Sequence, residues 1–136
     1  MIKKLPLSLF ISTAFAAIAG LLFGFDTGII SGALNPLRNY FHLSTLYCEL
    51  VVSSVLISAA LSSLISGHLA DRLGRRYTLM LAAVCYIIGT TLSSYSFSVT
   101  ELIIARIIIG FAIGISSYLA PLYIAEISPR QYRGAL

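Results

Sequence analysis

Two long apolar stretches of the chain are joined by one short polar segment, Gly67-His68-Leu69-Ala70-Asp71-Arg72-Leu73-Gly74-Arg75-Arg76. Residues 50–70 on one side and 77–100 on the other contain no Asp, Glu, Lys or Arg. Each stretch is long enough for a helix to cross a hydrocarbon layer ~30 Å thick. The polar segment therefore predicts a tight loop over 67–76 between two membrane-spanning helices.

The composition of the whole chain also points to lipid as its solvent. Of 136 residues, 58% are apolar and 10% are charged, whereas an average soluble domain has roughly 45–50% apolar and about 25% charged residues. Such a chain lacks the polar groups to cover its own surface in water, which excludes a soluble enzyme, a nucleic-acid-binding domain and a disordered tail. Cys48 and Cys85 make no disulfide framework, and we expect neither a metal nor a cofactor.

Two further helices are expected at the two ends of the chain. The N-terminal one contains a single charged residue, Asp26. The C-terminal one contains Arg106 and ends before Pro129, because proline interrupts helical hydrogen bonding. The predicted fold is an all-α membrane protein, one domain over 1–136, with transmembrane helices at about 8–30, 50–70, 77–100 and 102–127.

A cleaved secretory signal is the alternative for the first of these helices. Lys3 and Lys4 precede an apolar run that contains the small-residue triplets Ala14-Phe15-Ala16 and Ala17-Ile18-Ala19, which resemble a cleavage site. The apolar run continues to Ile30. This is too long for the apolar region of a signal peptide and favours a retained helix.

Positive charge is distributed unequally between the predicted loops. If the N-terminus is inside, Arg38 is the one loop cation outside, and seven lie inside: Lys3, Lys4, Arg72, Arg75, Arg76, Arg130 and Arg133. Because cytoplasmic loops are enriched in Lys and Arg, we expect both termini and the 67–76 loop in the cytoplasm. The sequence has no Asn-x-Ser/Thr acceptor, which is compatible with a bacterial inner membrane.

Small residues recur at four-residue spacing on three of the predicted helices. In lipid, close backbone approach at small residues is a main source of helix association. The spacing therefore predicts a tightly packed bundle. The positions are Gly20, Gly24, Gly28 and Gly32 on the first helix, Ser54, Ser58, Ser62 and Ser66 on the second, and Gly110 and Gly114 on the fourth.

Asp26 and Arg106 are charged residues within predicted spans, whereas Glu126 stands at the end of the fourth span. A charged side chain there costs roughly 2.5–3.5 kcal/mol and is tolerated mainly where it faces a partner or a wet cavity. At ~1.5 Å per residue, Asp26 lies about 27 Å from the cytoplasmic face and Arg106 about 7 to 8 Å from the outer face, so both are in the outer half. A direct or water-bridged pair is allowed. The alternative is that each side chain reaches the outer interface separately.

The helical wheel turns Asp26 away from the glycine stripe, about 200° from Gly24, so it can face a cavity. Phe23 lies on the same face and either lines a ligand path or contacts lipid. Desolvation favours a protonated carboxyl group, whereas a nearby arginine favours the carboxylate. We therefore expect Asp26 to act as a proton switch that takes up a proton from outside and loosens its pairing with Arg106.

The polar segment 67–76 closely resembles the G-x-L-A-D-R-x-G-R-R signature of the major facilitator superfamily. Two further stretches resemble the sugar porters within it. Phe23-Gly24-Phe25-Asp26-Thr27-Gly28-Ile29-Ile30-Ser31-Gly32-Ala33-Leu34 is similar to their first helix. Pro121-Leu122-Tyr123-Ile124-Ala125-Glu126-Ile127-Ser128-Pro129-Arg130, with Arg133-Gly134, is similar to the end of their fourth helix. The similarity covers essentially the whole chain.

The resemblance implies a role for each matching residue. Asp26 matches the first-helix acid of proton-coupled members and Arg106 its fourth-helix partner, which favours symport over facilitative uniport. Phe23 matches an aromatic position near the sugar. The signature loop and the inner charge network, which latches the cytoplasmic gate when the transporter opens outward, comprise Gly67, Asp71, Arg72, Gly74, Arg75, Arg76, Glu126 and Arg130.

Members of this superfamily have twelve helices in two halves that rock about a sugar held near the midplane. The resemblance therefore implies that this chain holds the first four helices, the N-terminal part of a sugar:proton symporter, and that it does not transport alone. A truncated reading frame or an incompletely recorded sequence would account for its length. The expected partners are the lipid bilayer, a monosaccharide or polyol, and the proton; no nucleic acid is expected.

Three alternatives remain open at this point. One is a small membrane scaffold that self-associates or joins separately encoded helices to rebuild a transporter. Another is a facilitative sugar uniporter. A four-helix multidrug exporter has a similar length, but it is not expected to carry the loop and fourth-helix motifs. The sequence is compatible with a pentose, a hexose or inositol as the sugar.

Overall fold

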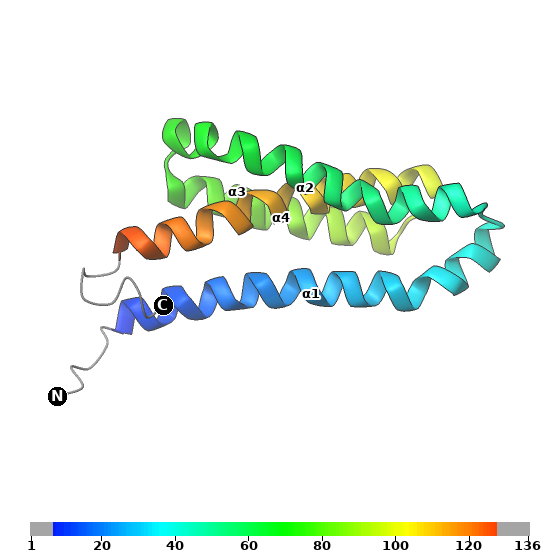
Figure 1. Cartoon of the computed structure of the whole chain (residues 1–136), viewed down its shortest axis with the longest axis horizontal. Helices are drawn as coiled ribbons and strands as arrows, with labels where there is room; N and C mark the ends of the chain where they lie inside the picture. Colours follow the sequence, from blue (N-terminus) through cyan, green and yellow to red (C-terminus); the bar gives the residue numbers. More distant parts are fainter. Residues whose placement is uncertain (1–6, 128–136) are drawn as a thin grey trace.

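The computed structural model describes the backbone of residues 7–127 and folds it into four helices. These are α1 (Leu7–Phe41), α2 (Thr45–Leu73), α3 (Arg75–Ser94) and α4 (Val99–Ile127), joined by short connections (Figure 1). The predicted all-α fold with four helices is confirmed. Short connections force successive helices to run antiparallel, so the α1–α2 and α3–α4 connections lie at one end of the bundle. The α2–α3 break lies at the other (Figure 1).

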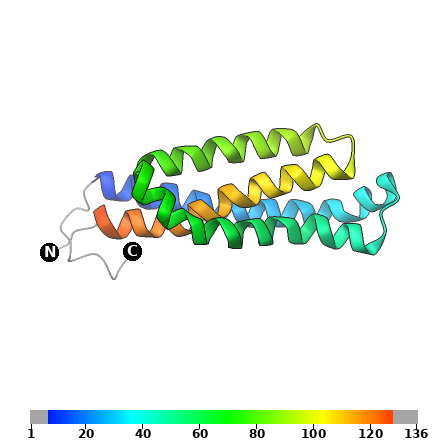
Figure 2. The same cartoon turned by 90° about the horizontal axis from the view of Figure 1, so that it is seen from above.

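The helix α4 holds the bundle together. It runs along both α2 and α3, and α1 packs mainly against α4 (Figure 2). Three apolar clusters follow one another along this arrangement. Their buried members are Ile30, Val51 and Leu102 in the first, Val55, Ile109 and Ile113 in the second, and Ala70, Ala82, Ile115 and Leu119 in the third.

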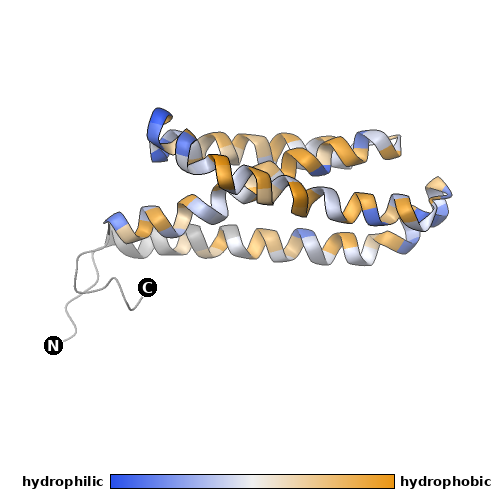
Figure 3. Cartoon of the chain, turned by 45° about the horizontal axis from the view of Figure 1, so that its top comes forward, coloured by the Kyte–Doolittle hydropathy of each residue, from blue (hydrophilic) through white to orange (hydrophobic). Residues whose placement is uncertain are grey.

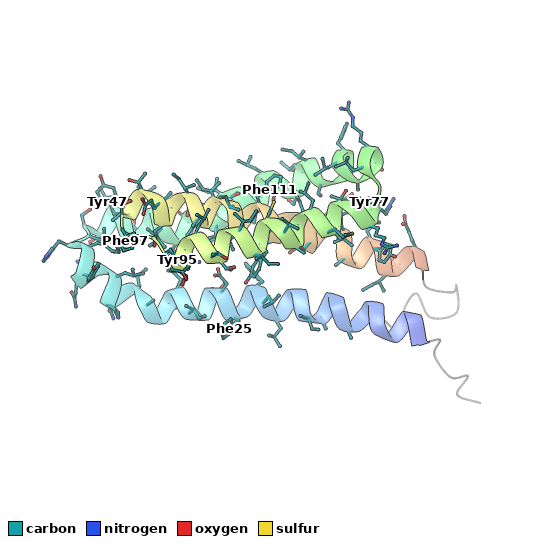
Figure 4. The ribbon with its side chains drawn as sticks, turned by 180° about the vertical axis from the view of Figure 1, so that it is seen from behind. Phe25, Tyr47, Tyr77, Tyr95, Phe97 and Phe111 are labelled. Carbon is teal, nitrogen blue, oxygen red and sulfur yellow. The ribbon has the colours of Figure 1, made fainter. Side chains whose placement is uncertain are left out.

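Hydropathy along the bundle fits a membrane protein. Within the described residues, α2, α3 and α4 are long and apolar enough to cross a membrane. Hydrophilic residues gather at the two ends of the bundle, with apolar residues between them (Figure 3). Exposed aromatic side chains also mark both ends, with Tyr47, Tyr95 and Phe97 at one and Tyr77 at the other (Figure 4). Aromatic belts of this kind are typical of membrane interfaces.

The helix ends differ from the expected spans. The helix α1 continues beyond residue 30 to Phe41, with Pro36 inside it. The expected end at residue 30 came from the ~20 residues that a helix needs to cross lipid, and a helix can extend beyond the lipid. The helix α3 ends at Ser94 instead of residue 100. Serines compete with the backbone for hydrogen bonds. After them Ser98 and Glu101 form a capping box: Oε2 of Glu101 accepts from the Phe97 and Ser98 amides, and Ser98 Oγ accepts from the Glu101 amide.

The segment 67–76 is not the loop that we expected. The helix α2 continues to Leu73 and α3 begins at Arg75, so Gly74 alone interrupts the two helices. Gly74 has a φ of 86°, which glycine adopts without the steric cost that a side chain would add. The buried hydroxyl of Thr78 donates to the Gly74 and Leu69 carbonyl oxygens, 3.0 and 3.4 Å away. The bond to Leu69 links the start of α3 to the end of α2 across this one-residue break.

The predicted close packing of small residues is confirmed between α2 and α4. A Cβ atom on Gly110 would meet the Val55 carbonyl oxygen, and one on Gly114 would meet Ser62 Oγ. Ser58 Oγ also donates across the interface to the carbonyl oxygen of Ile107, at 2.7 Å. Glycine is required at both α4 positions because the α2 backbone occupies the space of a side chain.

The glycine stripe of α1 behaves differently. A Cβ atom on any of its four glycines would meet nothing within 4 Å. The prediction that this stripe packs tightly is wrong for contacts within the described chain. The physical reason is that α1 turns the opposite face, which carries Asp26, toward α4. The stripe consists of Gly20, Gly24, Gly28 and Gly32.

Candidate functional site

An ion pair joins α1 to α4 inside the bundle. Nη1 of Arg106 donates to Oδ2 of Asp26 at 2.8 Å, and the two residues are 80 positions apart in the chain. The Arg106 side chain is 5% exposed and that of Asp26 is 13% exposed. This direct contact agrees with the similar depths that the sequence predicts for the two side chains. The alternative in which each reaches the interface separately does not fit this geometry.

Apolar layers enclose the pair on both sides along the bundle axis. One turn beyond Asp26 and one turn before Arg106, Ile30 and Leu102 pack with Val51. On the opposite side, Phe23 packs against the Val55 and Ile109 cluster. Charges attract more strongly in such a low-dielectric environment than in water. Their burial is also costly, so removing one partner leaves the other uncompensated.

Arg106 is only partly satisfied by this pair. Its Nε atom is buried and has no hydrogen-bond partner among the described residues. Buried polar groups in proteins are nearly always hydrogen-bonded. The guanidinium therefore has a free donor inside the bundle while it is paired with Asp26.

Phe23 and Tyr86 are the aromatic side chains next to the pair. Both are partly buried and pack against Val55 and Ile109. Phe23 is thus held against the core instead of standing free in a cavity. Tyr86, on α3, lies close enough to interact with the charges of both Asp26 and Arg106. Tyr86 is not among the site residues expected from the sequence, because a tyrosine within an apolar helix carries no signal of charge or spacing that distinguishes it from a core residue.

The charged residues of the α2–α3 junction lie at the other end of the bundle. Nη1 of Arg75 lies 2.8 Å from Oε1 of Glu126, with side chains 29% and 47% exposed. Asp71, Arg72 and Arg76 are exposed, and in the part of the chain that is described they form no ion pair.

The remaining residues expected at this end are Gly67, Gly74 and Arg130. Gly67 lies against Tyr118, whose hydroxyl oxygen would be 3.6 Å from a Cβ atom placed there. Gly74 forms the break between α2 and α3. Arg130 lies outside the described residues. The structure therefore pairs Arg75 with Glu126 and shows no other ion pair among the expected gate residues that it describes.

Comparison with known proteins places this arrangement in a family. The family model described as "Sugar (and other) transporter" matches residues 12–136. The chain belongs to the sugar transporter family. The match includes both members of the ion pair and the α2–α3 junction.

Curated sugar transporters resemble this chain closely over a limited part of their own length. The arabinose-proton symporter of Escherichia coli (strain K12) is 45% identical over 130 residues, which are 96% of this chain and 27% of that protein. The galactose-proton symporter of the same organism is 42% identical over 121 residues, 89% of this chain and 26% of that protein. The chain thus spans about a quarter of the length of these relatives.

The fold agrees with that of a solved sugar transporter. The inward-open structure of the xylose transporter XylE from E. coli matches with a TM-score of 0.83 and 34% identity. The match covers 93% of this chain and 34% of XylE. The four helices therefore correspond to part of the major facilitator fold, as the motifs implied.

Proposed function

We propose that this chain supplies the first four transmembrane helices of a sugar:proton symporter, in which Asp26 accepts the transported proton. The observation that carries the proposal is the Asp26–Arg106 pair, 2.8 Å apart and enclosed by apolar layers. A carboxylate in hydrocarbon is costly and is typically found in ion pathways and proton relays. Relatives named for arabinose-proton and galactose-proton symport support the substrate class, a monosaccharide.

Proton uptake changes what holds α1 to α4. A protonated Asp26 is neutral, so the charge attraction to Arg106 is lost while the guanidinium remains buried. The pair then favours a different arrangement of the two helices, and the proton is coupled to a conformational change by this difference. Phe23, one turn from Asp26, is proposed to contact the sugar path when that arrangement changes. The reaction moves solutes and makes or breaks no covalent bond, so we do not propose an enzyme.

The charged residues at the α2–α3 junction are proposed to form the gate at the cytoplasmic end. Arg75 and Glu126 are paired but partly exposed, and exposed pairs contribute about 0–1 kcal/mol each. A network of such weak pairs can open at low cost. Asp71, Arg72, Arg76 and Arg130 are proposed to join it when the gate closes. The chain would then lie in a bacterial inner membrane with both termini on the cytoplasmic side.

Transport requires further helices in this proposal, because a sugar site near the midplane forms between two halves of the transporter. The open face of α1 supports this requirement, since its glycine stripe contacts nothing in the described chain. The partners of the four helices are lipid and the remaining helices of a transporter. A self-associating membrane scaffold would use the same face.

A chimeric transporter tests the proposal. Residues 1–136 replace the matching N-terminal region of the E. coli arabinose-proton symporter, with which they share 45% identity, and arabinose uptake is measured in cells with and without a protonophore. We expect accumulation above the external concentration that the protonophore abolishes. Uptake that only equilibrates and ignores the protonophore would indicate a uniporter. A chimera that inserts in the membrane but carries no arabinose would contradict the proposal.

A further inference from the structure

Tyr86 lies next to the ion pair, on a helix that neither partner belongs to. It lies on α3, packs in the cluster of Val55 and Ile109, and shares that cluster with Phe23 of α1. Phe23 is one helical turn from Asp26, and Ile109 is one turn from Arg106. The ring therefore packs about one turn from the pair along the bundle axis, and the phenol is close enough to interact with the charges of both partners.

Arg106 provides a hydrogen-bond donor that lacks an acceptor. The residue is 4% exposed, and its Nε–H has no partner among the described residues. The Tyr86 hydroxyl likewise makes no hydrogen bond to another described residue. A phenol oxygen accepts a hydrogen bond while its own proton stays in place. The two groups are thus complementary.

We propose that Tyr86 is a positioning residue for proton coupling. When Asp26 is protonated and releases Arg106, the phenol oxygen of Tyr86 accepts a hydrogen bond from Arg106 Nε. The proton taken up stays on Asp26, Arg106 remains charged, and Tyr86 keeps its own proton. Tyr86 thereby stabilises the protonated state, in which Arg106 would otherwise be a buried cation without a partner. This inference rests on the proposed function in the step that it assigns to Asp26.

Few other side chains can accept a hydrogen bond from Arg106 Nε. The titratable side chains that face Arg106 are Asp26 from α1 and Tyr86 from α3. From α2, the residues in the layers on the two sides of the pair are apolar, Val51 and Val55. No other titratable side chain of α2 or α3 makes a hydrogen bond or ion pair with Arg106 among the described residues; these side chains are Tyr47, Cys48, Glu49, His68, Asp71, Arg72, Arg75, Arg76, Tyr77 and Cys85.

The variant Tyr86→Phe removes the oxygen and keeps the ring that packs against Val55 and Ile109. In the arabinose chimera, we expect the pH of half-maximal uptake to fall by about one unit, which is a tenfold weaker protonation of the coupling group. The KM for arabinose at saturating proton concentration should stay unchanged. Tyr77→Phe is the matched control, because Tyr77 is 69% exposed at the end of the bundle. An unchanged or raised midpoint in Tyr86→Phe would overturn the inference.

A second measurement uses residues 1–136 alone in lipid vesicles and does not require transport. Infrared difference spectra follow the carbonyl stretch of protonated Asp26, identified as the band that Asp26→Asn removes. We expect Tyr86→Phe to move the appearance of this band to lower pH, and Tyr77→Phe to leave it in place. The same pH for Tyr86→Phe and the unmodified chain would overturn the inference. A shifted band with an inactive chimera would instead refute the proposed function and leave the role of Tyr86 intact.

Discussion

Among the described residues, Asp26 alone is paired with the buried charge of Arg106. The side chain is 5% exposed, and its one hydrogen bond within the described chain goes to Asp26. Burying a cation in hydrocarbon is tolerated mainly where a partner is present. The stability of the bundle and its response to protons are therefore coupled at this pair.

Replacing Arg106 alone should be more damaging than replacing the whole pair. Arg106→Gln leaves Asp26 buried without its cation, and we expect a loss of about 3–5 kcal/mol in the free energy of unfolding. The loss should be smaller at acid pH, where Asp26 can be neutralised. Unfolding of the purified chain in detergent, followed by circular dichroism, gives this quantity. The double variant Asp26→Asn/Arg106→Gln should recover most of the loss; a double variant no more stable than Arg106→Gln would contradict the ion-pair account.

Gly74 is the one residue that separates α2 from α3. Its φ of 86° is sterically unfavourable for any residue with a Cβ atom. Gly74→Ala should therefore lower the free energy of unfolding by about 1–2 kcal/mol. Gly67→Ala is the matched control, because it lies within α2 and its Cβ would make only an ordinary contact with Tyr118. Thermal unfolding of the two variants side by side distinguishes them. Equal stability of the two would mean that the break tolerates a side chain.

At the scale of elements, the α2–α4 interface is the closest helix contact of the bundle. The α2 backbone fills the space that side chains at Gly110 and Gly114 would need, and Ser58 donates a hydrogen bond across it. The contact requires the α4 glycines, whereas the α1 glycines face open space. The two stripes look alike in the sequence and differ in what they contact.

This difference predicts that Gly→Ala changes stability far more in α4 than in α1. Gly114→Ala should force α2 and α4 apart and lower the free energy of unfolding by about 1–3 kcal/mol. Gly24→Ala, on the open face of α1, should change it by less than about 1 kcal/mol in the isolated chain. Both are measured by unfolding in the same detergent. A loss at Gly24 as large as that at Gly114 would show that the α1 stripe is already packed.

At the scale of the whole molecule, the sequence predicts those features that depend on composition and spacing. The four helices follow from charge-free length and the glycine contact of α4 from four-residue periodicity. The similar depths of Asp26 and Arg106 in their spans allowed the contact between them. The helix ends do not, because a helix continues beyond the lipid. The direction of the α1 stripe and the position of Tyr86 also could not be predicted, because both depend on how α1 and α3 rotate against α4.

The proposed orientation of the bundle can be tested without transport. If both ends of the chain lie in the cytoplasm, alkaline phosphatase fused after Leu136 stays inactive, because this enzyme folds only outside the reducing cytoplasm. The same enzyme inserted in the α1–α2 connection at His42 should be active. Green fluorescent protein fusions at the two positions provide the converse control. Active phosphatase at the C-terminus would contradict the distribution of positive charge as a guide to orientation.

The most direct test of proton coupling is sugar-driven proton uptake by the arabinose chimera carrying Asp26→Asn. Proteoliposomes with an internal pH dye report proton entry when arabinose is added, and exchange of labelled arabinose at equal concentrations reports sugar movement alone. We expect Asp26→Asn to abolish proton entry and to retain exchange, while Glu49→Gln, an exposed acid at the end of α2, retains both. Proton entry at the unmodified rate in Asp26→Asn would contradict the proposal that Asp26 accepts the transported proton.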